Sequence, residues 1–265
     1  MTNPYRGDST VVTDLATREP VSIVMPAYNS EAFIAEAIAS VHGQTYSYWD
    51  LIVVDDCSRD GTVRVAREWA ERDPRVTVLS SPANGGTAAA RNLGLSHCEG
   101  RYIAFLDADD VWAPEKLEKQ LTFMAQYNAG FSFTTYQKFR PAGLGSVIGA
   151  SRTVSWRDML KGNRIGCSTV MLDTRLFPQI RFPTGLGRQE DYALWLSLLR
   201  GGGLAYGLNE PLVRYRVHEA SKSARKLPSV TAQWLVYREL EKLPPLHAAW
   251  YLSHYAVRGV IKALR

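Results

Sequence analysis

The stretch Arg101-Tyr-Ile-Ala-Phe-Leu-Asp-Ala-Asp-Asp110 decides the fold, because an apolar run in it stops abruptly at acidic residues. The apolar half predicts a strand that is buried on both faces. Asp107, Asp109 and Asp110 follow this run, with Ala108 between the first two. Carboxylates this close together raise one another's pKa unless a cation lies among them, and oxygen ligands suit Mg²⁺ or Mn²⁺. The alternative is an acidic turn that caps the following helix.

The chain up to this stretch alternates strands and helices. Buried strands are predicted at residues 21–25, 51–54, 76–79 and 102–106, each with a helix after it. This alternation predicts an α/β fold in which parallel strands have right-handed crossovers and their carboxyl ends share one edge. Ligands bind at such an edge. The turns that meet there contain Pro26, Ala27, Tyr28, Asn29, Asp55, Asp56, Gly85, Gly86 and the acidic run.

The second half of the chain has a looser pattern. It predicts strands at 131–136 and 167–172, a mobile loop at 140–151, a helix at 192–199, a strand pair within 204–216, and helices at about 230–243 and 247–264. We therefore expect a polar leader at residues 1–20, a main domain at 21–224 and a C-terminal helical extension at 225–265. The sequence contains no internal repeat.

The composition is that of an ordinary globular protein, with 265 residues of which 46% are hydrophobic and 22% charged. The net charge of +5 suits an acidic partner such as a nucleotide or an anionic lipid surface, and no nucleic-acid partner is expected. The three cysteines are scattered, which indicates reduced thiols in a cytoplasmic protein. The polar N-terminus predicts no signal peptide, and the longest apolar runs are too short to predict a membrane span. The sequence has neither the G-x-G-x-x-G dinucleotide motif nor a P-loop.

Several residues at the predicted edge have two interpretations each. The Tyr28 ring can stack on a base, or it can pack on the neighbouring helix. Asp55 and Asp56 end a buried strand, so one can accept a hydrogen bond from a base while the other supports the loop. Arg91 can pair with a diphosphate or with those two carboxylates. Gly86 allows either a close backbone approach to a ligand or a tight turn.

Three residues of the second half are candidates for chemistry. Glu190 and Asp191 precede an apolar helix, where acidic residues act as a capping pair that the helix dipole favours. A carboxylate in this place can also act as a general base if it faces the metal site. His218 follows a predicted strand, a position more typical of a surface histidine than of a metal ligand. Spacing alone does not decide between these interpretations.

Four segments resemble the motifs of glycosyltransferase family 2. They are Val21-Ser-Ile-Val-Met-Pro-Ala-Tyr-Asn29 and residues 53–62, 84–94 and 102–110, in that order. Residues 165–171, 189–195 and 215–223 resemble the branch of the family that builds bacterial cell-surface polysaccharides, such as teichuronic acid, capsule and exopolysaccharide. The resemblance covers residues 20–220. The sequence departs from the family pattern at Cys57, where glycine is usual, and at Thr87, where valine is common.

This resemblance implies a GT-A fold, which is a Rossmann-like, mainly parallel sheet flanked by helices, here with a C-terminal helical extension. It also implies a nucleotide-sugar donor, expected to be a UDP-sugar, with Mn²⁺ or Mg²⁺ and inversion at the anomeric carbon. By position, Tyr28 would stack on uracil and Asp56 would bind the base, with Asp55 beside it. Pro26, Ala27, Asn29, Gly86, Arg91 and Ala108 would complete the nucleotide site.

The acidic residues take distinct roles in the same resemblance. Asp107 would bind the ribose or a water on the metal side, and Asp109 would bind the metal under the diphosphate. His218 would add a metal contact in the closed complex. Asp191 would be the base that deprotonates the acceptor hydroxyl. The implied acceptor is a growing cell-surface glycan, linked to a polyprenyl diphosphate.

Two other functions and one membrane contact are weighed beside this one. A catalytically silent nucleotide-sugar-binding scaffold of a polysaccharide assembly complex is the first alternative. A nucleotidyltransferase should have a basic glycine-rich loop after the first strand, where this chain has Pro26-Ala-Tyr-Asn29. The helix at 247–264 has an apolar stripe that includes Trp250 and Tyr251, followed by basic residues. This helix either packs on the main domain or lies on the inner face of the cytoplasmic membrane.

Overall fold

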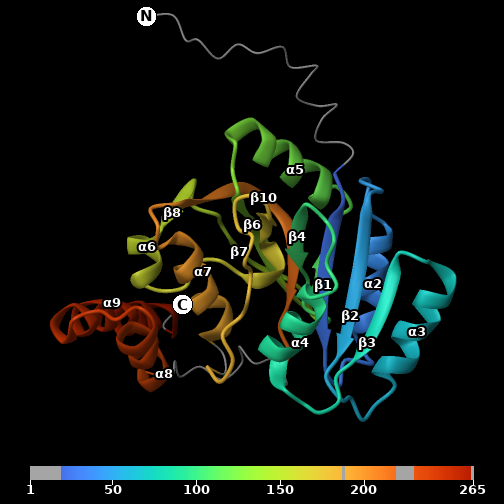
Figure 1. The fold of residues 1–265 in the computed structure, drawn as a ribbon, viewed down its shortest axis with the longest axis horizontal. Helices are drawn as coiled ribbons and strands as arrows, with labels where there is room; N and C mark the ends of the chain where they lie inside the picture. The colour runs from blue at the N-terminus through green and yellow to red at the C-terminus, as the bar shows by residue number, and fades with distance from the viewer. Residues whose placement is uncertain (1–18, 187–188, 219–229, 264–265) are drawn as a thin grey trace, which may run out of the picture.

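A computed structural model describes residues 19–186, 189–218 and 230–263. The predicted polar leader at 1–20 therefore lies almost wholly outside the described residues. The described residues form a sheet between helical layers, which confirms the predicted α/β fold class (Figure 1). The strands are β1 (Val21–Ala27), β2 (Trp49–Asp55), β3 (Val76–Ser80), β4 (Tyr102–Phe105), β5 (Val111–Trp112), β6 (Phe131–Arg140), β7 (Gly143–Ile148), β8 (Thr153–Ser155), β9 (Met171–Asp173) and β10 (Leu204–Arg216).

The ten strands of the described residues join in one sheet. Eight follow the order β3-β2-β1-β4-β9-β6-β10-β5, while β7 pairs with β6 and β8 pairs with β10. Strands β3, β2, β1 and β4 are mutually parallel, as their alternation with helices predicts. β9 pairs antiparallel with both β4 and β6, and β10 runs parallel to β6. The carboxyl ends of the four parallel strands therefore lie at the same edge of the sheet.

Helices cover both faces of this sheet (Figure 1). Ile23 and Met25 of β1 belong to the core that includes the helix after β1, whereas Val24 faces the helix after β3. That helix approaches closely, since a Cβ atom on Gly94 would lie 2.6 Å from Cγ1 of Val24. The helices are α2 (Ile34–His42), α3 (Thr62–Arg72), α4 (Gly86–Leu95), α5 (Lys116–Tyr127), α6 (Trp156–Leu160), α7 (Glu190–Leu199), α8 (Val230–Leu235) and α9 (Pro245–Ala263).

Three segments of the second half differ from the predictions. The mobile loop predicted at 140–151 is wrong, because β7 pairs there with β6 in an antiparallel hairpin. Nearly all of β7 is exposed, so its sequence lacks the alternation of a half-buried strand. The strand predicted at 167–172 is a short 3-10 turn, Cys167–Thr169, followed by β9. The strand pair predicted within 204–216 is the single strand β10, whose register shifts on either side of Pro211.

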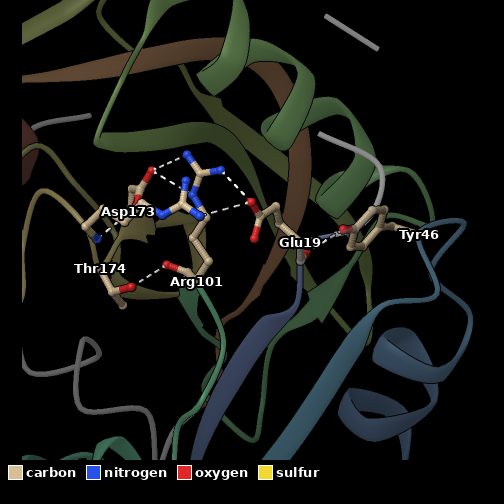
Figure 2. Close-up of polar contacts among 6 residues, drawn as sticks. Glu19, Tyr46, Arg101, Asp173 and Thr174 are labelled. Atoms are coloured by element: carbon tan, nitrogen blue, oxygen red, sulfur yellow. Dashed lines mark hydrogen bonds and ion pairs between the residues drawn. The ribbon is translucent and has the colours of Figure 1, made fainter. Parts of the chain in front are cut away.

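A polar network fastens the amino ends of β1 and β4 to the end of β9, at the edge opposite the strand carboxyl ends (Figure 2). The Arg101 guanidinium lies 2.9 Å from a carboxylate oxygen of Glu19 and 2.9 Å from one of Asp173. The Thr174 hydroxyl donates to the Arg101 carbonyl oxygen at 2.8 Å. The Tyr46 hydroxyl donates to the Glu19 carbonyl oxygen at 2.6 Å. This network joins the parallel strands to the antiparallel part of the sheet.

The C-terminal helices pack on the face of the sheet that also faces α4. Tyr237 and Ala248 are fully buried in the core that also contains Phe105 and Trp195. The apolar stripe predicted for α9 is divided, since Tyr251 packs against this core while Trp250 is 61% exposed. Among the described residues, no helix combines the length and the apolar character that a membrane crossing requires.

Candidate functional site

The turns after β1 and β2 hold each other in place. Asn29 has a left-handed backbone, with φ of 48°, and its N–H donates to the Ser58 hydroxyl at 2.9 Å. The Arg59 N–H donates in return to the side-chain oxygen of Asn29 at 2.8 Å. The Tyr28 ring beside them is 47% exposed, so it is open to solvent at this edge. Its stacking on a base stays a prediction.

Asp56 organises the loop before α4. Its two carboxylate oxygens accept the N–H groups of Gly85 and Gly86, each at 2.8 Å. Asp55 accepts the N–H of Ser58 at 3.2 Å, and both aspartates are buried. Both carboxylates therefore support loops in this structure. Since each carboxylate oxygen can accept more than one hydrogen bond, the predicted contact of Asp56 with a base remains a prediction.

Two positions at this edge adopt the left-handed backbone that favours glycine. Gly86 has φ of 80°, which a glycine adopts without steric cost. Cys57 has φ of 63°, which explains why glycine is the usual residue at its place in the family pattern. The Cys57 thiol donates to the Ser81 carbonyl oxygen at 3.2 Å and so links this loop to the end of β3.

Arg91 pairs with the acidic turn after β4. Its guanidinium lies 2.6 Å from Oδ1 of Asp107, so the predicted alternative of pairing with Asp55 and Asp56 is wrong. The Arg91 side chain is only 4% exposed and stacks 5.0 Å from the centre of the Phe182 ring. Its Nε atom is buried and has no hydrogen-bond partner among the described residues. A diphosphate contact for Arg91 stays a prediction.

Asp109 and His218 lie close together although they are 109 positions apart in the chain. Nε2 of His218 lies 3.0 Å from Oδ2 of Asp109, and both side chains remain partly exposed, at 22% and 30%. Burial and the neighbouring Asp107 carboxylate raise the pKa of Asp109. A bound cation would relieve this repulsion, and one oxygen with one imidazole nitrogen is a donor pair that suits Mn²⁺. Among the described residues, no three His, Cys, Asp or Glu side chains form a metal-binding cluster.

Asp110, the third carboxylate of the run, is completely buried. One of its oxygens accepts the Ser168 hydroxyl at 2.6 Å, and the other accepts the N–H of Arg216 at 3.0 Å. Burial, together with Asp109 and Asp107, raises the pKa of Asp110 well above its ordinary range. This residue is therefore not a direct ligand for substrate.

Asp191 lies in the first turn of α7, and its side chain is half-buried. Burial raises its pKa to about 6, with a further upward contribution from Glu190 and an opposing one from the positive charge of Arg91. One Asp191 oxygen accepts the N–H of Tyr192 at 2.6 Å, and the other accepts from Nδ2 of Asn163 at 3.3 Å. The residue thus supports the helix N-terminus and also has a pKa suited to a base near neutral pH. Its catalytic role stays a prediction.

Several residues around these groups were not predicted from the sequence. Ser168 contacts the acidic turn, Phe182 lies against Arg91, and Asn163 contacts Asp191. Residues 165–171 carry part of the family resemblance, but neither spacing nor periodicity assigns a contact to Ser168. Asn92, beside Arg91, exchanges two hydrogen bonds of 2.8 Å with the main chain of Phe182. Such contacts depend on how distant segments meet, which a local pattern does not encode.

Relatives of known name resemble this chain over most of its length. A Bacillus subtilis (strain 168) protein, TuaG, whose name assigns it to teichuronic acid biosynthesis, is 42% identical over 92% of this chain and 97% of its own. An Escherichia coli relative is named UDP-Glc:alpha-D-GlcNAc-diphosphoundecaprenol beta-1,3-glucosyltransferase WfgD. It is 36% identical over 91% of this chain and 94% of its own.

Solved structures share the fold at lower identity. S. aureus TarS 1-349 in complex with UDP-GlcNAc superposes with a TM-score of 0.70 at 21% identity, over 89% of this chain and 71% of that one. The Pyrobaculum calidifontis mannosyltransferase PcManGT, in complex with GDP-Man and Mn²⁺, gives a TM-score of 0.67 at 21% identity, over 93% and 75% of the two chains. The model of the family Glycosyl transferase family 2 matches residues 22–163. The chain therefore belongs to glycosyl transferase family 2, and it is a glycosyltransferase with the GT-A fold.

Proposed function

We propose that this enzyme transfers a sugar from a UDP-sugar to a hydroxyl of a lipid-linked cell-surface glycan, with inversion and with the help of Mn²⁺ or Mg²⁺. The observation that carries the proposal is a series of neighbouring charged groups that extends from Arg91 to His218. Asp107 pairs with Arg91, and its carboxylate also acts on Asp109, which lies 3.0 Å from His218. Asp191 lies within the electrostatic influence of the same arginine. These contacts support a metal and diphosphate site beside Asp191, whose carboxylate has a raised pKa.

Asp109 and His218 are the residues that would hold the metal, because their donor atoms are close and partly exposed. A divalent ion bound there supplies charge that neutralises the diphosphate leaving group. Arg91 would keep Asp107 oriented and add positive charge beside the phosphates. Tyr28, which is exposed at the end of β1, would offer its ring to the base.

Asp191 would take the proton of the acceptor hydroxyl as that oxygen attacks the anomeric carbon. A carboxylate with a pKa of about 6 is largely ionised at neutral pH and is still basic enough to accept a proton in the transition state. Attack from the face opposite the diphosphate gives inversion in one displacement, and no covalent nucleophile is needed. Asn163, through its hydrogen bond to Asp191, would orient the base.

The donor and acceptor classes are inferred from relatives and neighbours. The name of the E. coli relative specifies UDP-Glc and a diphosphoundecaprenol-linked GlcNAc, and a neighbour of the same fold binds UDP-GlcNAc. The name of the B. subtilis relative refers to teichuronic acid, a cell-surface polymer. These names support a UDP-sugar donor and a lipid-linked saccharide acceptor for this chain.

A lipid-linked acceptor also requires the enzyme to reach a membrane, and the outer surface of α8 and α9 is our candidate for that contact. Leu246 is 85% exposed, Trp250 is 61% exposed, and Leu235 on α8 is 49% exposed. The ring of Trp250 lies 4.8 Å from that of His254. Apolar and aromatic side chains on a surface helix are typical of contact with the lipid interface.

The decisive experiment for the transfer reaction is an Asp191→Asn exchange. The full chain would be incubated with Mn²⁺, UDP-sugars and a saccharide acceptor linked to a polyprenyl diphosphate. The release of UDP and the formation of the glycosylated product would be measured. We expect transfer to fall about a hundredfold or more while UDP binding is retained, which is the usual scale for loss of a general base. Asp158→Asn is the matched control, because Asp158 forms the capping box of α6 and lies outside the proposed site. Full transfer by Asp191→Asn would contradict the assignment of the base.

A further inference from the structure

The buried carboxylate of Asp110 joins three segments that are distant in sequence. Its oxygens accept the hydroxyl of Ser168, from the 3-10 turn before β9, and the N–H of Arg216, from the end of β10. The Asp110 side chain itself belongs to the turn after β4 and is 0% exposed. A carboxylate buried in this way is costly unless its lone pairs are satisfied, and here hydrogen bonds to two other segments satisfy them.

The same contacts reach the groups proposed to bind substrate and metal. The Ser168 oxygen that donates to Asp110 also accepts the N–H of Asp107 at 3.1 Å. The Arg216 Nε atom donates to the carbonyl oxygen of Asp109 at 2.8 Å. His218 follows Arg216 by two residues and approaches Asp109. The Ser168 hydroxyl therefore connects Asp110 to Asp107. Arg216, whose N–H donates to Asp110, connects it to Asp109 and to the nearby His218.

The Ser168 turn is also held by hydrogen bonds from β5 and α5. Nε1 of Trp112 donates to the Ser168 carbonyl oxygen at 2.9 Å, and Nζ of the buried Lys116 lies 4.0 Å from the centre of the Trp112 ring. The side-chain amide of Gln120 donates to the Thr169 carbonyl oxygen at 3.0 Å. The turn cannot move without breaking these contacts. Its hydroxyl is therefore a fixed reference point for the acidic turn.

The Arg216 side chain is anchored at the other side of the acidic turn. Its guanidinium lies 4.9 Å from the centre of the Phe33 ring and 4.3 Å from that of Phe139, and it also pairs with Glu36. The side chain is only 11% exposed. The end of β10 is thus fastened between α2 and β6, just before His218.

We propose that Asp110 and Ser168 form a positioning pair that holds Asp107, Asp109 and His218 in the geometry required for metal binding. Neither residue of the pair touches the metal or the substrate. The inference rests on the proposed metal-dependent function. It goes beyond that function because it assigns metal affinity to a serine 58 positions away from Asp110 in sequence.

The test is a titration of the full chain with Mn²⁺ in the presence of UDP. The electron paramagnetic resonance signal of free Mn²⁺ measures how much of the ion remains unbound. Ser168→Ala removes the hydroxyl, and Asp110→Asn keeps the side-chain shape but changes one of the two acceptor oxygens into an NH2 donor, so that it cannot accept from both Ser168 and Arg216. We expect each variant to bind Mn²⁺ at least about tenfold more weakly, which is the usual effect of changing a group that orients a metal ligand. UDP binding in chelator should be the same in both variants as in the unaltered chain.

Ser22→Ala is a closely matched control. The Ser22 hydroxyl is also fully buried, donates to a carboxylate (Asp50, at 2.9 Å) and accepts a main-chain N–H (Gly100, at 2.9 Å), but it lies near the amino end of β1. We expect Ser22→Ala to keep the Mn²⁺ affinity of the unaltered chain. The two exchanges in the positioning pair should also be less than additive when combined, because they break the same hydrogen bond.

The outcomes separate the inference from the function on which it rests. If the unaltered chain binds no Mn²⁺, the proposed metal-dependent function is wrong, and the positioning pair falls with it. If the unaltered chain binds Mn²⁺ and both variants bind it as tightly as the unaltered chain does, the positioning pair alone is overturned. If both variants lose the native circular dichroism spectrum, Asp110 and Ser168 serve only the fold, and the proposal is likewise overturned.

Discussion

Nε2 of His218 lies 3.0 Å from Oδ2 of Asp109, although 109 positions separate the two residues in the chain. The acidic turn after β4 supplies one partner, and the end of β10 supplies the other. The pair thus connects the parallel part of the sheet to β10, which lies between β6 and β5. Any ion held between these two atoms would couple the two parts, so the pair is the natural starting point for tests of the site.

Removing Asp109 should abolish the metal-dependent part of UDP binding. A ligand that binds only the folded state raises its stability, so UDP should raise the melting temperature of the unaltered chain more with Mn²⁺ than with chelator. For Asp109→Ala we expect no difference between Mn²⁺ and chelator. Thermal unfolding followed by intrinsic fluorescence measures this. If UDP stabilised the unaltered chain equally in chelator, the acidic turn would not be a metal site.

The rate of transfer should fall as the pH decreases through about 6, because the pKa of Asp191 is raised to about 6 and only its ionised form can accept a proton. A profile of kcat/KM between pH 4.5 and 8.5, on the order of one reading per half unit, would reveal this limb. The positive charge of Arg91 lowers the pKa of Asp191, so Arg91→Gln should move the limb to higher pH. A limb that stays in place in Arg91→Gln would show that another group titrates.

The outer surface of α9 should bind anionic membranes. We expect the full chain to sediment with phosphatidylglycerol vesicles at low salt and less so at high salt, since screening weakens attraction to anionic lipid. The exchanges Leu246→Ser and Trp250→Ser should reduce sedimentation. Both side chains are more than half exposed, so the fold should tolerate the exchanges. Leu144→Ser is the control, because Leu144 is 64% exposed on β7. If all three variants sedimented equally with the vesicles, the outer surface of α9 would not be the membrane contact.

Loss of Arg101 should destabilise the fold without changing the site directly. Its guanidinium is paired with Glu19 and with the 8% exposed Asp173, so Arg101→Ala leaves a buried carboxylate with fewer partners. We expect a loss of about 1–3 kcal/mol in the free energy of unfolding, measured by urea denaturation. The exposed Arg64, which pairs with Glu68 and Glu31, is the control, and Arg64→Ala should cost much less than Arg101→Ala because solvent screens exposed ion pairs. Equal losses for the two variants would contradict the role of the Figure 2 network.

The parallel half of the fold could be predicted because each of its strands and helices has a recognisable pattern in its own local sequence. Apolar runs at β1, β2 and β4 are continuous, and the polar turns after them fall at one edge by the topology of crossovers. The nucleotide-side candidates could be placed there for the same reason. What could not be predicted was which polar atoms pair, such as Arg91 with Asp107 rather than with Asp55 or Asp56.

The antiparallel half was harder for a physical reason. β7 is exposed on both faces and β9 is only three residues long. Neither strand therefore shows the alternation of apolar and polar residues by which a strand is recognised in a sequence. The contact of Ser168 with Asp110 depends on inserting β9 between β4 and β6. Such insertion is decided by packing over the whole sheet.

The insertion of β9 also separates the boundary of the family match from the boundary of the folded unit. The match ends at residue 163, whereas the partner that covers β4 lies at Met171–Asp173. A chain cut at residue 163 would leave the main-chain groups of Tyr102 and Ala104 open for pairing with other molecules, which favours aggregation. It would also lose Asp173, the partner of Arg101, and Ser168, the partner of Asp110. The family match therefore ends before the strand that protects the β4 side of the parallel sheet.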